Sequence, residues 1–133
     1  MNPEDPLPRP LLVVDGANVV GSVPDGWWRD RRGAAERLRD RLAATGGPAD
    51  GPYPGPYDVV LVVEGRARGV ASVPGVRVEE APGSGDDLIV ELVRGANGRP
   101  CLVVTADREL RRRAEEEGAR CMGPSGLPPA PAR

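Results

Sequence analysis

The sequence lacks histidine and lysine, so all 18 of its basic residues are arginine. Without histidine the chain cannot build a Ser-His-Asp or Cys-His triad, an HExxH metalloprotease site, or an iron site with two histidines and a carboxylate. Without lysine it cannot build a P-loop or form a Schiff base. The side chains that remain for catalysis are mainly the 20 carboxylates of aspartate and glutamate.

The sequence also lacks a strong excess of one charge and any long hydrophobic run. The net charge is −2, so no basic field covers the surface and any binding of nucleic acid must be local. The apolar run at residues 11–14 is too short for a signal peptide or a membrane span. Cys101 and Cys121 have neither zinc-ligand spacing nor the pattern of a disulfide framework. We therefore expect free thiols in a cytoplasmic protein that does not bind a membrane.

The length of 133 residues predicts a single domain. Proline-rich segments at residues 1–10 and 123–133 predict flexible tails, which leaves the domain at residues 11–122. Glycine and proline around residues 46–56 predict a mobile loop within that domain.

Strand patterns and helix patterns alternate along the domain. Short apolar runs predict strands, and apolar residues at helical spacing predict helices. Strands are expected at residues 11–14, 59–63, 76–78, 101–105 and 120–122, and helices at residues 29–44, 86–94 and 106–119. Asp86 or Asp87 is expected to cap the second of these helices. The alternation predicts a three-layer α/β/α sandwich with a mainly parallel central sheet.

Acidic residues follow the three strongest predicted strands. Asp15 and Glu64 come directly after two of them, and Asp107 comes two residues after the third. Asp86 and Asp87 are expected at the same edge, because the carboxyl end of each parallel strand leads into the start of a helix. Each acid alone is more often a turn residue or a helix cap. Together they would repel one another unless a cation or a proton compensated their charge.

A site made only of oxygen ligands suits Mg²⁺ or Mn²⁺. When such a site is open to solvent, it most often serves phosphodiester hydrolysis, which needs neither histidine nor lysine. Asn18 lies three residues after Asp15. It is expected to hold the Asp15 loop in shape, to contact phosphate, or to form a purely structural Asx turn.

Four segments carry a resemblance to a known family. In chain order they read VVDGANVVGS at residues 13–22, VVLVVEG at 59–65, GSGDDLIVEL at 83–92 and VVTADREL at 103–110. In this order and spacing, the domain resembles the NYN domains of the PIN-like nuclease superfamily, especially the bacterial YacP-like group. The resemblance implies a PIN-like fold and a metal-dependent ribonuclease whose acids bind Mg²⁺ or Mn²⁺ above the sheet.

The resemblance also implies which residues act. The acids of the family fall on Asp15, Asp86 and Asp107, with Asp87 as a neighbour that can substitute for Asp86. The asparagine of the family falls on Asn18. The sequence departs from the family at Glu64, where relatives commonly have aspartate, so the reach of this side chain as a metal ligand differs.

Arginines beside these acids are candidate phosphate ligands. Arg66 and Arg68 follow Glu64, and Arg108 follows Asp107, so each can bind a phosphate of the substrate. Arginine is also common elsewhere in the chain, so these side chains are equally compatible with an ordinary solvated surface.

Two adjacent tryptophans precede the first long helix. Trp27 and Trp28 can stack on an unpaired base, cover the sheet, or contact a partner.

Three functions fit these features. The first is an endoribonuclease that cuts RNA by metal-dependent hydrolysis through Asp15, Asp86 and Asp107. The second is a PIN-like domain that binds RNA or a protein without cutting it, which the departure at Glu64 and the pI of about 5.2 favour. The third is a nucleotide pyrophosphohydrolase, since the same acids and metals also serve phosphoanhydride bonds. The sequence leaves open whether the chain forms a homodimer.

Overall fold

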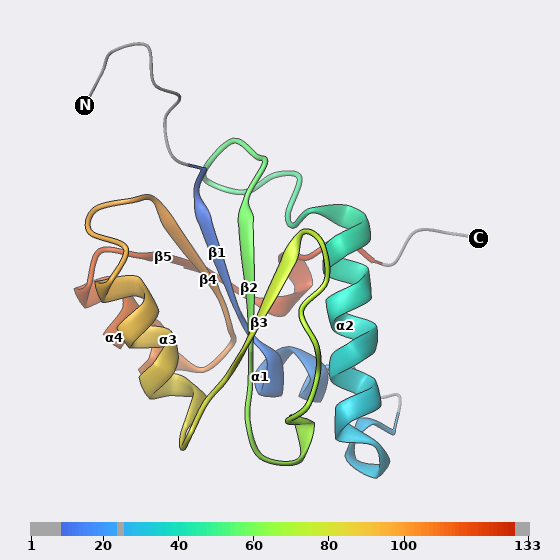
Figure 1. Cartoon of the computed structure of the whole chain (residues 1–133). Helices are drawn as coiled ribbons and strands as arrows, with labels where there is room; N and C mark the ends of the chain where they lie inside the picture. Colours follow the sequence, from blue (N-terminus) through green and yellow to red (C-terminus); the bar gives the residue numbers. More distant parts are fainter. Residues whose placement is uncertain (1–8, 24–25, 130–133) are drawn as a thin grey trace.

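The fold is built on a parallel β-sheet (Figure 1). The structure is a computed structural model, and it describes residues 9–23 and 26–129. Its strands are β1 (Leu11–Asp15), β2 (Asp58–Val63), β3 (Val76–Glu80), β4 (Cys101–Val104) and β5 (Arg120–Met122). They lie in the order β3-β2-β1-β4-β5, and every neighbouring pair is parallel. Each strand predicted from the sequence is present.

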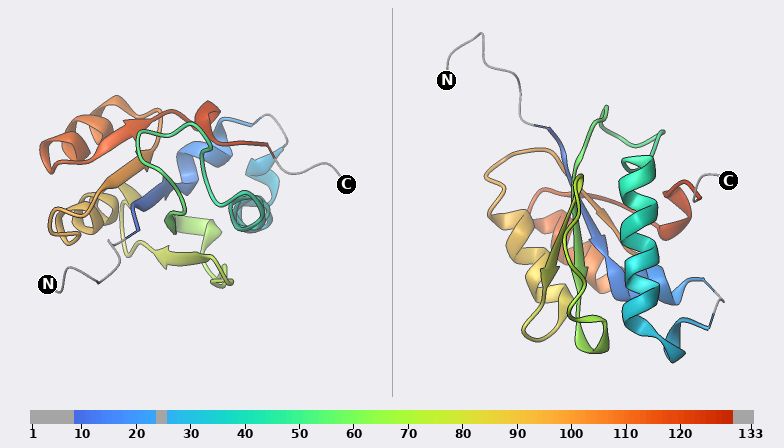
Figure 2. Two further views of the ribbon diagram at one scale, coloured as in Figure 1. Left: turned by 90° about the horizontal axis from the view of Figure 1, so that it is seen from above. Right: turned by 45° about the vertical axis from the view of Figure 1, so that its right-hand side comes forward.

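Helices cover both faces of the sheet. The helices α1 (Gly16–Gly21) and α2 (Arg31–Thr45) lie on one face, and α3 (Gly85–Arg94) and α4 (Arg108–Glu116) lie on the other (Figure 2). Short 3-10 helices occur at η1 (Trp27–Arg29), η2 (Gly65–Ala67) and η3 (Pro124–Gly126). The prediction of a three-layer α/β/α sandwich is confirmed.

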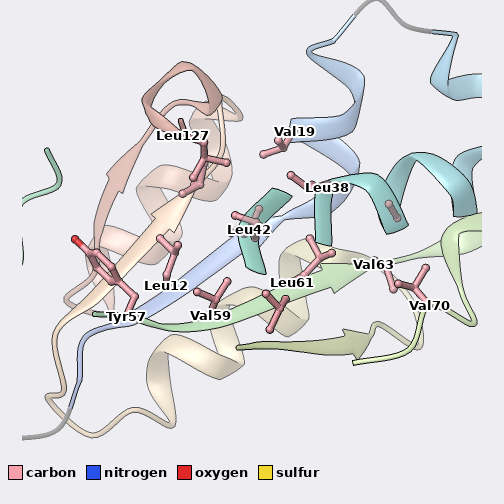
Figure 3. Packing of buried hydrophobic residues seen from close by; sticks show 14 of the residues in the cluster. Leu12, Val19, Leu38, Leu42, Tyr57, Val59, Leu61, Val63, Val70 and Leu127 are labelled. Atoms are coloured by element: carbon pink, nitrogen blue, oxygen red, sulfur yellow. The ribbon is translucent and has the colours of Figure 1, made fainter. Parts of the chain in front are cut away.

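The inner strands are buried on both faces, which is why their sequences read as uninterrupted apolar runs. On β1, Leu12 and Val14 face a cluster to which α2 contributes Leu38 and Leu42 (Figure 3). Val13 faces the opposite cluster, to which α3 and α4 contribute Ile89, Val90, Val93, Leu110 and Ala114. The apolar side chains of one strand therefore belong to two separate cores.

The helix starts lie at the carboxyl edge of the sheet, and side-chain caps fix where they begin. Asp30 caps α2 by accepting from the N–H of Gly33 over 2.9 Å. The cap of α3 is Ser84, whose Oγ accepts from the N–H of Asp86 over 3.1 Å. The prediction that Asp86 or Asp87 caps this helix is wrong, because the helix begins one residue earlier, at Gly85, and places both acids inside its first turn.

The segment after β5 packs against the domain instead of leaving it. Leu127 is buried in the cluster beneath α2. Arg41 of α2 donates to the carbonyl oxygens of Pro128, over 2.6 Å, and Leu127, over 3.1 Å. The predicted tail boundary at residue 122 is therefore wrong on this side. Proline limits the helical structure here to the short helix η3, but it does not prevent an apolar residue from docking. Residues 1–8 and 130–133 of the two predicted tails lie outside the described residues.

The connection between α2 and β2 contains neither helix nor strand, as its glycine and proline predict. It is nevertheless anchored to the core, because Tyr57 is buried and its hydroxyl donates to the carbonyl oxygen of Tyr53 over 2.7 Å. Cys101 and Cys121 are free thiols, as expected. Across residues 9–23 and 26–129, the longest apolar helical stretch falls short of what a bilayer crossing requires.

Candidate active site

The strand order reverses between β1 and β4, and ligands of open α/β sheets bind at the carboxyl ends of the strands at such a point. From β1 the sheet continues through β2 to β3 on one side, and from β4 to β5 on the other. Asp15 is the last residue of β1, and Thr105 directly follows β4. Both are buried, with 7% and 0% of their surfaces exposed. This edge of the sheet, at the bottom of Figure 1, is therefore the candidate site.

Side-chain hydrogen bonds join the two halves of the sheet across this reversal. Thr105 Oγ1 donates to Asp15 Oδ2 over 2.9 Å and accepts from the N–H of Asp107 over 3.1 Å. Asn18 Oδ1 accepts from the N–H of Ala106 over 2.8 Å. The side chain of Asn18 thus ties α1 to the loop after β4, which agrees with the expectation that it holds the segment after Asp15 in shape.

Glycine at position 16 is required by the close approach of α1 to β2. A Cβ atom at this position would lie 2.5 Å from the carbonyl oxygen of Val62, which is too close for any side chain. Asp15 also caps α1, since its Oδ1 accepts from the N–H of Asn18 over 3.4 Å. This short segment therefore does three things. Asp15 places a carboxylate at the end of the strand, Gly16 lets α1 start close to the sheet, and Asn18 brings its side-chain amide to the loop after β4.

The structure gives Glu64 a position that the sequence leaves open. Its Oε2 accepts a hydrogen bond from the N–H of Gly85, the first residue of α3. Gly85 permits this contact, because a Cβ atom there would lie 2.7 Å from the same oxygen. Glu64 therefore carries negative charge to the start of a helix, where the helix dipole favours it.

The two acids in the first turn of α3 differ in their surroundings. Asp86 is partly buried and faces the other acids of the edge. The side chain of Asp87 is 69% exposed and forms an ion pair with Arg113 of α4, with 2.9 Å between Oδ1 and Nη2. Asp86 is thus the better placed of the two to act with Asp15, and Asp87 links α3 to α4.

Burial and mutual repulsion shape the charges of these acids. Burial raises the pKa of Asp15, the hydrogen bonds from Thr105 and from the N–H of Asn18 oppose this, and the charges of Asp86 and Glu64 raise it further. Burial also raises the pKa of Asp86. Repulsion from Asp107 and Glu64 adds to that rise, and Arg113 opposes it. Acids from four segments of the chain therefore lie close enough to repel one another electrostatically. We call Asp15, Glu64, Asp86 and Asp107 the acidic centre.

The acidic centre has the donor chemistry of a divalent metal site, but its side chains are engaged with the protein. Within the described ranges, no three acidic or cysteine side chains stand together in a way that could hold a metal ion. Glu64 bonds to Gly85, and Asp107 Oδ1 caps α4 by accepting from the N–H of Leu110 over 3.0 Å. Asp15 and Asp86 each carry charge that burial and neighbouring acids disfavour. A cation would compensate that charge, and carboxylate oxygens are ligands that Mg²⁺ and Mn²⁺ prefer, so the residues fit such an ion in their chemistry but not in the present arrangement of their side chains.

The three arginines expected to bind phosphate lie after β2 and at the start of α4, at the same edge of the sheet. Arg66 and Arg108 are exposed, and neither forms a hydrogen bond or an ion pair with any residue that the structure describes. Arg68 Nη2 donates to the carbonyl oxygens of Ala81, over 2.8 Å, and Pro82, over 3.1 Å, so its guanidinium supports the loop before α3.

Solved structures share this arrangement of strands and helices. One of them is Rae1 (YacP) from Bacillus subtilis, which superimposes at a TM-score of 0.70 with 20% sequence identity. The match covers 87% of this chain and 70% of the Rae1 chain. This chain has the fold of Rae1 (YacP). The W164L mutant of Rae1 matches the same shares of the two chains at a TM-score of 0.65 and 18% identity. The sequence itself matches no protein-family model and no curated protein.

The likeness to Rae1 (YacP) confirms the resemblance to the YacP-like group that the sequence motifs carry, at the level of the fold. The predicted arrangement of a parallel sheet between helix layers is confirmed with it. One residue of the site was missed at the sequence level. Thr105 is the only polar residue in the predicted strand at residues 101–105, and a polar residue at the carboxyl end of a buried strand is the signal that identifies it.

Proposed function

We propose that this protein is a metal-dependent endoribonuclease that hydrolyses phosphodiester bonds of RNA at the acidic centre. The observation that carries the proposal is the position of three acids from separate segments at the carboxyl edge of the sheet, where Asp15 ends β1, Asp86 lies in the first turn of α3 and Asp107 caps α4. The Rae1 (YacP) fold and the sequence motifs of the YacP-like group support it.

Asp15, Asp86 and Asp107 are the residues that would hold the metal ion. Glu64 is a further donor whose second oxygen is left when Oε2 bonds to Gly85. The bound ion would supply a water of lowered pKa and would compensate the negative charge of the reacting phosphate. Asp87 contributes less, because its carboxylate is paired with Arg113.

Other side chains of the protein orient the acids and bind the RNA. Thr105 holds the carboxylate of Asp15 in one orientation, and Asn18 keeps α1 and the loop after β4 together. Arg66 and Arg108, exposed at the same edge of the sheet as the acidic centre, bind phosphates of the RNA that flank the scissile bond. Arg68 remains a predicted phosphate ligand that also supports its own loop. Local arginines thus attract RNA although the net charge of the chain is −2.

Cleavage of a labelled single-stranded RNA by the purified full chain tests the proposal. Mn²⁺ or Mg²⁺ should support cleavage, EDTA should abolish it, and Asp15→Asn should reduce it by about a thousandfold or more. The matched control is Asp50→Asn, which removes an exposed acid remote from the carboxyl ends of the strands and should cleave like the wild type.

Two results would overturn the proposal. One is cleavage by Asp15→Asn at the wild-type rate, which would indicate a contaminating nuclease or another site. The other is hydrolysis of nucleoside triphosphates, assayed beside RNA, by a protein that leaves RNA intact.

A further inference from the structure

A small cavity opens beside the acidic centre, on the α2 face of the sheet. Its volume is about 160 Å³, and its walls come from α1, η1, the first turns of α2, the end of β2 and η2. Gly16 and Glu64 both line it. Since Gly16 follows Asp15 and Glu64 belongs to the acidic centre, the cavity and the candidate active site share a border. Its volume is well below the range of pockets for drug-sized ligands, so it admits one small group.

The lining of the cavity combines an aromatic ring, a cation and a carboxylate. Trp27 and Arg31 form one wall, and the Arg31 guanidinium carbon lies 5.3 Å from the centroid of the Trp27 ring. Val20, Ala35 and Val63 supply apolar surface. Such a lining suits a flat group with an aromatic face and polar edges, because rings and guanidinium planes stack on that face.

The position of Trp27 is set by its packing. The ring lies against the end of α1, where a Cβ atom at Gly21 would stand 3.7 Å from it. Its other ring neighbour is Trp28, in an edge-to-face contact with 6.1 Å between centroids. Trp28 itself is 54% exposed and does not line the cavity. Adjacent tryptophans therefore have different places, one in the cavity wall and one outside it.

We propose that this cavity binds a single unpaired nucleobase of the RNA whose neighbouring phosphate lies at the acidic centre. The base stacks against Trp27 and Arg31, and Glu64 accepts a hydrogen bond from its polar edge. The inference rests on the proposed nuclease function and specifies its substrate as single-stranded RNA. A base inside a duplex is stacked and paired, so it cannot enter a cavity of this size.

RNA binding by the full chain, measured in EDTA by fluorescence anisotropy of a short labelled RNA, tests the inference. Trp27→Leu is compared with Trp28→Leu, and Arg31→Met with Arg29→Met. The second member of each pair removes the same group outside the cavity, since Arg29 lies over the ring of Trp28. Trp27→Leu and Arg31→Met should weaken binding of single-stranded RNA by about tenfold or more, and the two controls should bind like the wild type.

Two further comparisons sharpen the test. A duplex of the same sequence should bind the wild type weakly, and Trp27→Leu should not weaken it further. In Trp28→Phe, Trp27 is the remaining tryptophan, and its fluorescence should fall as single-stranded RNA saturates the protein. Arg31 is exposed, so Arg31→Met decides the matter if Trp27→Leu does not fold, as judged by circular dichroism.

The outcomes separate this inference from the proposed function. If the wild type cleaves RNA while Trp27→Leu and Arg31→Met bind and cleave as their controls do, the cavity does not bind a base and the nuclease remains. If the wild type does not cleave but binds single-stranded RNA through Trp27 and Arg31, the cavity is a base site and the nuclease proposal fails. Equal binding of duplex and single strand by the wild type would overturn the inference.

Discussion

Replacing Thr105 by valine removes a single hydroxyl from the point where the strand order reverses and leaves the side-chain shape almost unchanged. This hydroxyl makes two hydrogen bonds, as donor to Asp15 Oδ2 over 2.9 Å and as acceptor from the N–H of Asp107 over 3.1 Å. Thr105 is fully buried and Asp15 nearly so, so water cannot replace the lost bonds freely. The substitution therefore measures how much the Thr105 hydroxyl contributes to the link between Asp15 and Asp107.

The expected loss of stability follows from the groups left without partners. A buried polar group that loses its partner costs about 1–3 kcal/mol. Thr105→Val leaves the buried Oδ2 of Asp15 without this donor and the half-buried N–H of Asp107 without an acceptor, so we expect a loss of roughly 3 kcal/mol. Thr105→Ser keeps the hydroxyl and removes one methyl group, which costs about 1 kcal/mol. Thr105→Val should therefore be less stable than Thr105→Ser by about 2 kcal/mol, because the hydroxyl contributes more than the methyl group.

Urea unfolding followed by circular dichroism in EDTA measures both variants without a contribution from bound metal. The difference should shrink as the pH falls, and it should begin to shrink above the ordinary pKa of an aspartate, because burial raises the pKa of Asp15 and a protonated Asp15 depends less on an accepted hydrogen bond. Equal free energies of unfolding for Thr105→Val and Thr105→Ser at neutral pH would refute this account of the site.

Three further variants test other parts of the structure. In EDTA, Asp86→Asn should gain thermal stability relative to the wild type as the pH rises from about 3.5 to 7. The pKa of Asp86 is raised in the folded protein, so its stabilising contribution is full below the pKa of the unfolded chain and is lost as the pH rises through the pKa of the folded state. A difference in stability that does not depend on pH would contradict this. Gly16→Ala, forced against the carbonyl of Val62, should lower the free energy of unfolding by more than about 2 kcal/mol, whereas Gly83→Ala, with open space around it, should stay within about 0.5 kcal/mol of the wild type. Leu127→Ala should cost about 2–4 kcal/mol in urea unfolding, and a cost near zero would mean that the segment after β5 does not belong to the core.

Much of the candidate site could be predicted from local sequence. Strands buried on both faces require apolar runs, so the ends of those runs locate Asp15, Glu64 and Asp107. Parallel strands share one carboxyl edge, and this rule brings the acids to the same side before any contact is known. Local sequence does not determine where α3 starts, because Ser84, Asp86 and Asp87 are all good cap residues. Asp86 or Asp87 was the predicted cap, and the observed cap is Ser84.

Contacts between distant residues could not be predicted in this way. Thr105 and Asp15 are 90 residues apart, and their hydrogen bond exists because β4 pairs with β1. The docking of Leu127 beneath α2 likewise depends on where β5 ends. The proline-rich composition of this segment predicts a tail, because proline disfavours long helices and central strands. Composition alone carries no information about a surface that another part of the chain provides.

The sequence by itself determined which segments are strands and helices, that carboxylates stand at the strand ends, and that the chemistry would have to do without histidine and lysine. These features are local, because periodicity and residue type reflect which faces of an element are buried. The tertiary structure decided that β1 lies between β2 and β4, that Glu64 reaches the start of α3, and that Trp27 and Arg31 border a cavity beside the acids. Strand order and the distances between elements depend on how all the buried faces pack at once, which no single segment encodes.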